Sequence, residues 1–340
     1  METIYFIKSK LLKNLAKTLS SELSKMGLKG KKVAVKAHMG EYGNLNYVRP
    51  PVVGAVVEEI KKAGGKPFVF DSPVAYTGSR DTVEKYKDTA RRNGFTEETI
   101  GCPIVITNTG VKVKSKFLSK LEIVKELTEA DAFVVISHFK GHELTNYGAA
   151  IKNLGMGCVT KESKKTMHSE TRAKYESSKC IGCGTCAKIC PEHAFEIKNG
   201  KAVFNEDACF GCGGCVRKCP SKALTCRTVP FSKALAEAAS LVLKNFKSDK
   251  VLFVNLLLDI SKTCDCYPIG DSDPGPKVAP DLGILVSKNI VIIDEASYCL
   301  VNMATNNKFG EIFPADIELQ TNSARQFGLG GRKYKIIGVQ

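Results

Sequence analysis

Long apolar runs and nucleotide-binding motifs are both missing from this sequence of 340 residues. No stretch approaches the roughly twenty apolar residues of a membrane-spanning helix, so no membrane partner is expected. No G-x-G-x-x-G turn follows a strand pattern, and no G-x4-G-K loop followed by Ser or Thr occurs. The sequence therefore gives no support for binding of a dinucleotide by a Rossmann turn or of a nucleotide by a P-loop.

An RNA-binding signature is also absent, although the net charge is +15. The lysines are scattered, and no cluster of arginine and aromatic residues interrupts them, so nucleic acid is not the expected partner. The excess positive charge suits an acidic redox partner or an anionic small molecule.

Lysines interrupt the apolar residues of the first 27 positions. The leucines there fit one helix face: Leu11, Leu12, Leu15, Leu19 and Leu23. This pattern predicts a core helix rather than a transit peptide, in a soluble, cytoplasmic protein.

Two cysteine runs dominate the middle of the chain, CIGCGTCAKICP and CFGCGGCVRKCP. Each is C-x2-C-x2-C-x3-C-P, the ligand run of a bacterial ferredoxin with two [4Fe–4S] clusters, in which the fourth cysteine ligates the other cluster. A zinc ribbon needs only two C-x2-C pairs, and a disulfide framework needs an oxidising compartment. The predicted ligands are Cys180, Cys183, Cys186 and Cys219 for cluster 1, and Cys209, Cys212, Cys215 and Cys190 for cluster 2.

The runs repeat after 29 residues, from Cys180 to Cys209. A ferredoxin-like domain over residues 176–228 is too small to bury much apolar surface, so we expect the metal to hold it together. Strand and helix patterns alternate on both sides of it, over residues 1–175 and 229–340. This order predicts an α/β fold, with a mostly parallel sheet or sheets and flanking helices, interrupted by the inserted domain. One α/β domain and two such domains joined through the insertion both fit.

Polar side chains follow several of the predicted strands, where ligands bind in open α/β sheets. The chain has only five histidines, and four of them fall in these loops. Imidazoles bind metals or move protons near neutral pH. We predict binding and protonation of an anionic substrate or a flavin-type cofactor by Lys36, His38, Arg49, His138, His142 and Lys152.

Three further segments are candidate binding sites. Ser79 and Arg80 follow a strand that ends in aspartate. The glycine-flanked GAAIKNLGMG segment either approaches an anionic ligand through Asn153, Gly155 and Gly157 or is a helix packed through Gly and Ala. Cys264 and Cys266 either ligate an additional metal, form a redox thiol pair or lie in a turn without a ligand. Three further cysteines, Cys158, Cys226 and Cys299, are expected to be buried thiols.

Several of these segments together resemble domain of unknown function family 362 (DUF362). The resemblance is carried by the K-x-H-x-G-E-x-G-N run from Lys36, by HFKGHEL, GAAIKNLGMG and MHSE, by the cysteine runs, and by the stretch from ISKTCDC to IDEAS. It implies a cytoplasmic protein that carries out iron–sulfur redox chemistry in the metabolism typical of anaerobes. It also implies a fold distantly similar to the nickel-dependent lactate racemase group, without its nickel chemistry. Family members often have Asp-Pro where this chain has Lys288 and Asn289.

The leading hypothesis is an oxidoreductase in which two clusters pass low-potential electrons to a substrate, flavin or metal bound by the α/β domain. The second is an electron-delivery protein that docks and activates a partner such as an acidic ferredoxin, a flavodoxin or a client enzyme. The third is an RNA-modifying redox enzyme, for which steeply salt-dependent RNA binding is the test.

Overall fold

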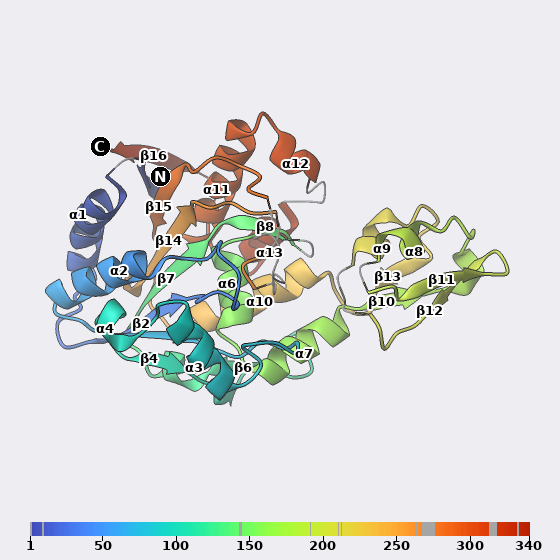
Figure 1. Cartoon of the computed structure of the whole chain (residues 1–340), viewed down its shortest axis with the longest axis horizontal. Helices are drawn as coiled ribbons and strands as arrows, with labels where there is room; N and C mark the ends of the chain where they lie inside the picture. Colours follow the sequence, from blue (N-terminus) through green and yellow to red (C-terminus); the bar gives the residue numbers. More distant parts are fainter. Residues whose placement is uncertain are drawn as a thin grey trace.

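An eight-stranded, mostly parallel sheet forms the centre of the α/β fold (Figure 1). The computed structural model describes residues 2–8, 10–142, 145–190, 192–209, 211, 213–262, 264–266, 276–312, 318–331 and 333–340. In sheet order the strands are β16 (Tyr334–Val339), β1 (Glu2–Ile7), β15 (Gly283–Ser287), β14 (Val251–Leu257), β7 (Ala132–His138), β2 (Lys32–Ala37), β3 (Lys66–Asp71) and β4 (Ile104–Ile106). β15 is antiparallel to both neighbours, and the other pairs are parallel. The predicted fold class is confirmed.

Helices cover both faces of this sheet, because side chains alternate in direction along each buried strand. Val33 and Val35 pack on the face covered by α1 (Leu11–Ser24), α2 (Pro50–Lys62), α3 (Val83–Arg92) and α4 (Glu97–Ile100). Ala34 and Phe133 pack on the opposite face, under α6 (Ala150–Gly157), α10 (Phe231–Leu243), α11 (Ile290–Ala304) and α13 (Glu318–Gln326). The remaining α-helices outside the cysteine runs are α5 (Lys125–Thr128), α7 (Lys161–Glu170) and α12 (Lys308–Ile312).

Two short strand pairs complete this part of the chain. β5 (Gly110–Lys112) pairs with β6 (Glu122–Val124), and β8 (Lys140–His142) pairs with β9 (Asn146–Gly148). Among the described residues, no helix is both long and apolar enough to cross a bilayer.

The N-terminal segment differs from the prediction in one respect. Its helix is present as α1, with Leu15, Leu19 and Leu23 buried, but Leu12 is 44% exposed and lies off the packed face. The strand β1 before it was not predicted. It finds its partners, β15 and β16, near the other end of the chain, so no neighbouring sequence pattern indicates it.

The cysteine runs form a small unit with internal symmetry, shown at the right of Figure 1. β10 (Ala173–Tyr175) pairs with β13 (Leu224–Cys226), and β11 (Phe195–Lys198) forms a hairpin with β12 (Lys201–Phe204). Each run contains a short helix before its fourth cysteine, α8 (Thr185–Ile189) or α9 (Gly214–Lys218), which follows a left-handed glycine, Gly184 or Gly213. The sequence repeat is therefore also a repeat of backbone conformation.

Another pair of equivalent glycines shows how this unit meets the α/β part. Gly182 and Gly211 both have positive φ, 69° and 86°. A Cβ on Gly182 would lie 2.1 Å from the Gly200 carbonyl oxygen within the unit. A Cβ on Gly211 would lie 2.4 Å from the His168 carbonyl oxygen on α7. The second run is thus packed closely against the α/β part. The strands on either side of the insertion share one sheet, since β7 pairs directly with β14; the boundaries at 175/176 and 228/229 stay a prediction.

A buried carboxylate fixes the helix that carries part of the site. Helix α6 has no side-chain cap of its own. Instead, Asp294 on α11 accepts hydrogen bonds from the backbone N–H groups of Ala150 and Ile151, both at 2.9 Å, and from the Asn255 amide at 2.9 Å. Burial raises the pKa of Asp294 to about 6, although these donors favour the charged form.

We expect Asp294→Asn to lower the free energy of unfolding by about 2 kcal/mol, because the new amide would turn a donor toward one of the two N–H groups. Urea unfolding followed by far-ultraviolet circular dichroism measures this. Asp88→Asn removes an exposed carboxylate that pairs with Arg91 and Arg92, and should cost less than about 1 kcal/mol. Equal effects of the two variants would contradict the capping role.

Candidate functional site

A cavity of about 670 Å³ lies at the carboxyl ends of the parallel strands. Small-molecule sites have this size. Lys36 of β2, Asp71 of β3 and Lys152 of α6 line it, together with Asp207 and Cys209 of the inserted unit. Its cationic lining residues are Lys36, Arg80, Lys140, Lys152, Lys164 and Arg172, and its acidic ones are Asp71, Glu192, Asp207 and Asp265. The cavity therefore spans the α/β part and the second cysteine run and has a positive excess.

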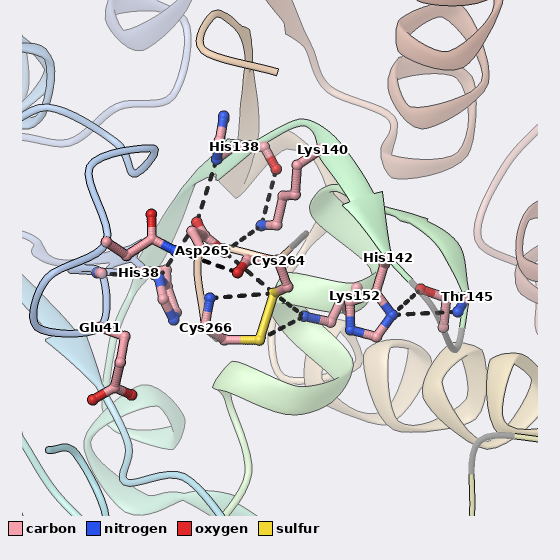
Figure 2. Close-up of a disulfide and its surroundings, with 12 residues drawn as sticks. His38, Glu41, His138, Lys140, His142, Thr145, Lys152, Cys264, Asp265 and Cys266 are labelled. Carbon is pink, nitrogen blue, oxygen red and sulfur yellow. Dashed lines mark hydrogen bonds and ion pairs between the residues drawn. A yellow bond between two sulfur atoms is a disulfide. The ribbon is translucent and has the colours of Figure 1, made fainter. Parts of the chain in front are cut away.

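Asp265 is the anion that joins the strand ends. It is 1% exposed, and its Oδ1 lies 2.9 Å from the Lys140 Nζ. Its Oδ2 lies 3.4 Å from the Nδ1 atoms of both His38 and His138 (Figure 2). Burial alone would raise the pKa of Asp265, but the neighbouring His38 and Lys140 hold it well below its usual value. Asp265 is therefore ionised at neutral pH.

Arg80 and Gly40 contact the two ring nitrogens of His38. The Arg80 Nη1 lies 2.7 Å from His38 Nε2, and a guanidinium can only donate, so Nε2 accepts this hydrogen bond. His38 Nδ1 lies 3.2 Å from the Gly40 backbone N–H and 3.4 Å from Asp265 Oδ2. Burial lowers the pKa of His38 to about 4, which keeps the ring neutral. His138 differs, because its Nε2 lies 2.8 Å from the Leu258 carbonyl and must donate to it.

Arg80 itself is buried and fully engaged. Its Nε donates to Glu41 at 2.9 Å, and its Nη2 donates to the Tyr76 hydroxyl at 2.8 Å and to the Cys266 carbonyl at 3.2 Å. Ser79 donates to the same Glu41 through its backbone N–H at 3.0 Å and through its hydroxyl. Arg80 and Ser79 thus hold the loops together rather than offering free groups to a ligand.

Two sulfur atoms face the cavity beside a lysine and a histidine. The structure pairs Cys264 and Cys266 as a disulfide in a turn. The Lys152 Nζ lies 3.1 Å from Cys264 Sγ and 3.9 Å from Cys266 Sγ. His142 offers a ring nitrogen that lies, with both sulfur atoms, in a group spanning no more than 4.8 Å, and Figure 2 shows its ring beside the pair. These donors suit either a thiol redox centre or a metal ion. Pro268, Gly270, Asp271 and Asp273 lie outside the described residues.

A second buried network lies deeper in the cavity. The Lys36 Nζ contacts Asp71 at 3.1 Å and Asn153 Oδ1 at 2.8 Å. A Cβ on Gly157 would lie 2.2 Å from the Lys36 Cε, so a larger residue there would require the lysine side chain to shift. The Lys164 Nζ donates to the Ser72 carbonyl at 2.9 Å, the Ser72 hydroxyl at 2.8 Å and the Pro73 carbonyl at 2.6 Å.

Two lysines of the cavity, Lys152 and Lys164, have pKa values near neutral pH. Burial, with Lys140 nearby, lowers the pKa of Lys152 to about 7. Burial also lowers the pKa of Lys164 to about 7, against the attraction of Asp71. The pKa of His142 falls well below its usual value through burial and the adjacent Lys152 and Lys140. The site therefore holds fewer full charges than its composition suggests.

The cysteines of the runs gather in the inserted unit. A hollow is lined by the cysteines predicted for cluster 1: Cys180, Cys183, Cys186 and Cys219. Backbone N–H groups of Gly182 and Ala202 donate to Cys180 Sγ at 3.4 and 3.5 Å. Of the residues predicted for cluster 2, Cys190, Cys209 and Cys215 belong to a packed apolar group that also includes Cys180, Cys186 and Cys219. Cys212 lies outside the described residues.

Not every predicted residue reaches the cavity. Arg49 is half-exposed and pairs with Asp259 at 3.4 Å, so its placement in the site is corrected. Gly155 faces α10, where a Cβ would lie 2.6 Å from the Leu235 carbonyl oxygen, so it serves helix packing. The helical alternative for this segment is therefore correct, although Asn153 and Gly157 of the same helix do line the cavity. Cys158 is buried as expected and Cys226 partly so, but Cys299 is exposed.

Sequence reasoning missed several residues of the site. Lys140 lies midway between His138 and His142, so in an extended strand all three side chains point to the same face. This alternation is a sequence signal for Lys140. Asp265 lies between the two cysteines, and its place in the sequence does not indicate that it meets His38, His138 and Lys140. Lys164 carried no signal, because only the placement of α7 against β3 brings it to Ser72.

Comparison with known proteins gives a family and two short similarities. A model of the family described as Domain of unknown function (DUF362) matches residues 33–298. A thylakoid-associated protein of Synechocystis sp. is 33% identical over 125 residues, 36% of this chain and 36% of that protein. Ferredoxin-2 of Desulfomicrobium norvegicum is 57% identical over 28 residues, 8% of this chain and 48% of that protein. The matched part is thus less than half of either relative's length.

Solved structures also match this chain. The lactate racemase apoprotein from Thermoanaerobacterium thermosaccharolyticum aligns with 75% of this chain and 50% of that chain, at 13% identity and a TM-score of 0.37. The ferredoxin similarity, together with the group formed by His142, Cys264 and Cys266, supports an iron–sulfur or other metal-binding role.

The low pKa of Lys164 predicts a pH dependence of stability. Between pH about 7 and the ordinary lysine value of about 10.4, the unfolded chain keeps a proton that the folded chain has lost, so stability rises with pH. Lys164→Met should lower that slope by about 1 kcal/mol per pH unit, measured from urea midpoints at several pH values. Lys165→Met, at an exposed neighbouring position, should leave the slope unchanged. An unchanged slope in Lys164→Met would refute the assignment.

Proposed function

Because this chain belongs to the DUF362 family, whose description names no reaction, we propose its function from its geometry: an iron–sulfur redox protein that delivers low-potential electrons to a group bound at the strand ends of the α/β part. One observation carries the proposal. Cys209, a predicted cluster ligand, lines the same cavity as Lys36, His38 and Lys152.

The residues of the inserted unit fit two [4Fe–4S] clusters. The hollow among the first four cysteines and the N–H groups aimed at Cys180 provide thiolate ligands and sulfur hydrogen bonds, the features that tune such centres. In the second run, the Ala194 N–H donates to Cys190 Sγ at 3.3 Å. Cluster 1 would be held by Cys180, Cys183, Cys186 and Cys219, and cluster 2 by Cys209, Cys212, Cys215 and Cys190. When bound, each cluster supplies one electron at low potential.

The two cysteine groups differ in solvent exposure, and this difference suggests a direction for electron flow through the unit. Cys183 of the first group is exposed, whereas Cys209 and Cys215 of the second are only 8% and 7% exposed. We therefore assign entry of electrons to the first group and exit into the cavity to the second.

The cavity suits an anionic ligand, such as a small carboxylate or phosphate or a flavin. Most of its cations are already neutralised by protein groups, as Lys36 is by Asp71 and Lys140 is by Asp265. Arg172 is different, because its buried Nε has no hydrogen-bond partner among the described residues. Arg172 and Lys152 are the groups that would bind the ligand's charge, with His142 and the neutral His38 beside it for proton transfer.

A second function, electron delivery to a client protein, is favoured by exposed apolar side chains on the inserted unit. Ile181 is 66% exposed and Val203 is 47% exposed, close in sequence or fold to the first cysteine group. Anaerobic pull-down with Ile181→Asp as the control tests it. A client captured by the wild type and lost in this variant would favour delivery over chemistry within the chain.

Iron analysis of anaerobically purified protein tests the clusters and their crossed ligands. The wild type should hold about eight irons per chain, and Cys219→Ala about four. The double variant Cys183→Ala/Cys219→Ala should still hold about four, because both cysteines serve cluster 1. Loss of all iron in the double variant would show that Cys219 belongs to cluster 2. Cys226→Ser, in the same unit but outside the runs, should retain the full content; a wild type without cluster iron would refute the proposed function.

A further inference from the structure

The Cys264–Cys266 pair lies in the cavity where the proposed electron path ends. Both cysteines line it together with Cys209 of the second run. Neither belongs to a ferredoxin run, and the structure pairs them as a disulfide. A disulfide is a two-electron acceptor.

We propose that the Cys264–Cys266 disulfide is the resident electron acceptor of this protein, a dithiol/disulfide centre that collects two single electrons. The inference rests on the proposed function, in which the electrons come one at a time from the inserted unit. The S–S bond breaks, the two sulfur atoms take up two electrons and two protons, and two S–H groups form. The chain thereby converts one-electron reductants into a two-electron thiol reductant.

The turn that carries the sulfurs is held independently of the disulfide. The Asp265 side chain between them turns away toward Lys140, and its backbone carbonyl accepts from the Glu41 N–H at 3.1 Å. The Cys266 carbonyl accepts from Arg80 and from the Tyr76 hydroxyl. Because these contacts do not involve the S–S bond, the turn keeps its shape after reduction, and the two sulfurs stay close enough to reoxidise.

Polar groups around the sulfurs stabilise the reduced state. The Lys152 Nζ lies 3.1 Å from Cys264 Sγ, and the Cys266 N–H donates to the same sulfur at 3.4 Å. Both groups stabilise the negative charge that develops on Cys264 Sγ as the S–S bond breaks, before a proton reaches this sulfur. Lys152 is also the nearest group that can give this sulfur a proton, and the second proton comes from solvent through the cavity.

A competing occupant of the same atoms is a metal ion. His142 and the two sulfurs in their reduced form would supply three ligands. A hydrogen-bond chain holds the His142 ring in place. Its Nδ1 lies 3.0 Å from the Thr145 hydroxyl, which itself donates to the Tyr147 carbonyl at 2.7 Å. The experiment must therefore count electrons and metals together.

Coulometric titration of the anaerobic holoprotein tests the proposal. The wild type should take up about four electrons, one for each of two clusters and about two for the disulfide. The double variant Cys264→Ser/Cys266→Ser should take up about two, with unchanged iron content and cluster spectrum. If the double variant loses iron or folds poorly, Cys266→Ser alone gives the same comparison.

Alkylation of free thiols tests whether the two additional electrons taken up by the wild type reduce the Cys264–Cys266 disulfide. Trypsin cleavage after Lys262 and Lys277 releases both cysteines in one peptide, residues 263–277. This peptide should carry no label before reduction and two labels after it, by mass spectrometry. Equal electron counts in wild type and variant would overturn the proposal, and so would a non-cluster metal that disappears with the two cysteines. If the wild type holds no clusters, the proposed function fails, and labelling after dithiothreitol still shows whether the pair forms a disulfide.

Discussion

The buried carboxylate of Asp265 is the interaction on which the site depends. It meets His38 after β2, His138 at the end of β7 and Lys140 at the start of β8, so three segments of the sheet edge converge on one anion. A buried charge without partners would cost several kcal/mol, which is why this group has cations and imidazoles on all sides. Its position between two cysteines means that the same contacts also place both sulfur atoms.

A second constraint sets where the inserted unit sits. Gly211 allows the second cysteine run to approach the carbonyl oxygen of His168, while the equivalent Gly182 packs within the unit. The internal repeat is therefore symmetric in backbone and asymmetric in environment. Cys183 of the first run is exposed, whereas Cys209 of the second run lines the cavity. A unit with two equivalent halves thereby acquires an outer and an inner end.

Most of the charged side chains around the cavity bind other groups of the protein. Arg80 binds Glu41, Tyr76 and the Cys266 carbonyl, and Lys164 binds the backbone after β3. Burial removes part of the remaining charge by lowering the pKa of Lys152 to about 7. The result is a pocket with a modest positive excess in which protons can move near neutral pH, next to a pair of sulfur atoms.

The sequence by itself determined the α/β class and the two cysteine runs. Periodicity reports burial, and the cysteine spacing is a local pattern, so both can be read from neighbouring residues. It also indicated that His38, Lys152, Cys264 and Cys266 belong to a site, because they follow strands.

Only the tertiary structure decided which polar residues meet. β1 became part of the sheet through partners more than 270 residues away. Arg49 fell outside the cavity and Lys164 inside it, because helix packing sets which face of α2 or α7 points to the strand ends. Asp265 gained its role from three segments distant in sequence, and no local pattern encodes such a convergence.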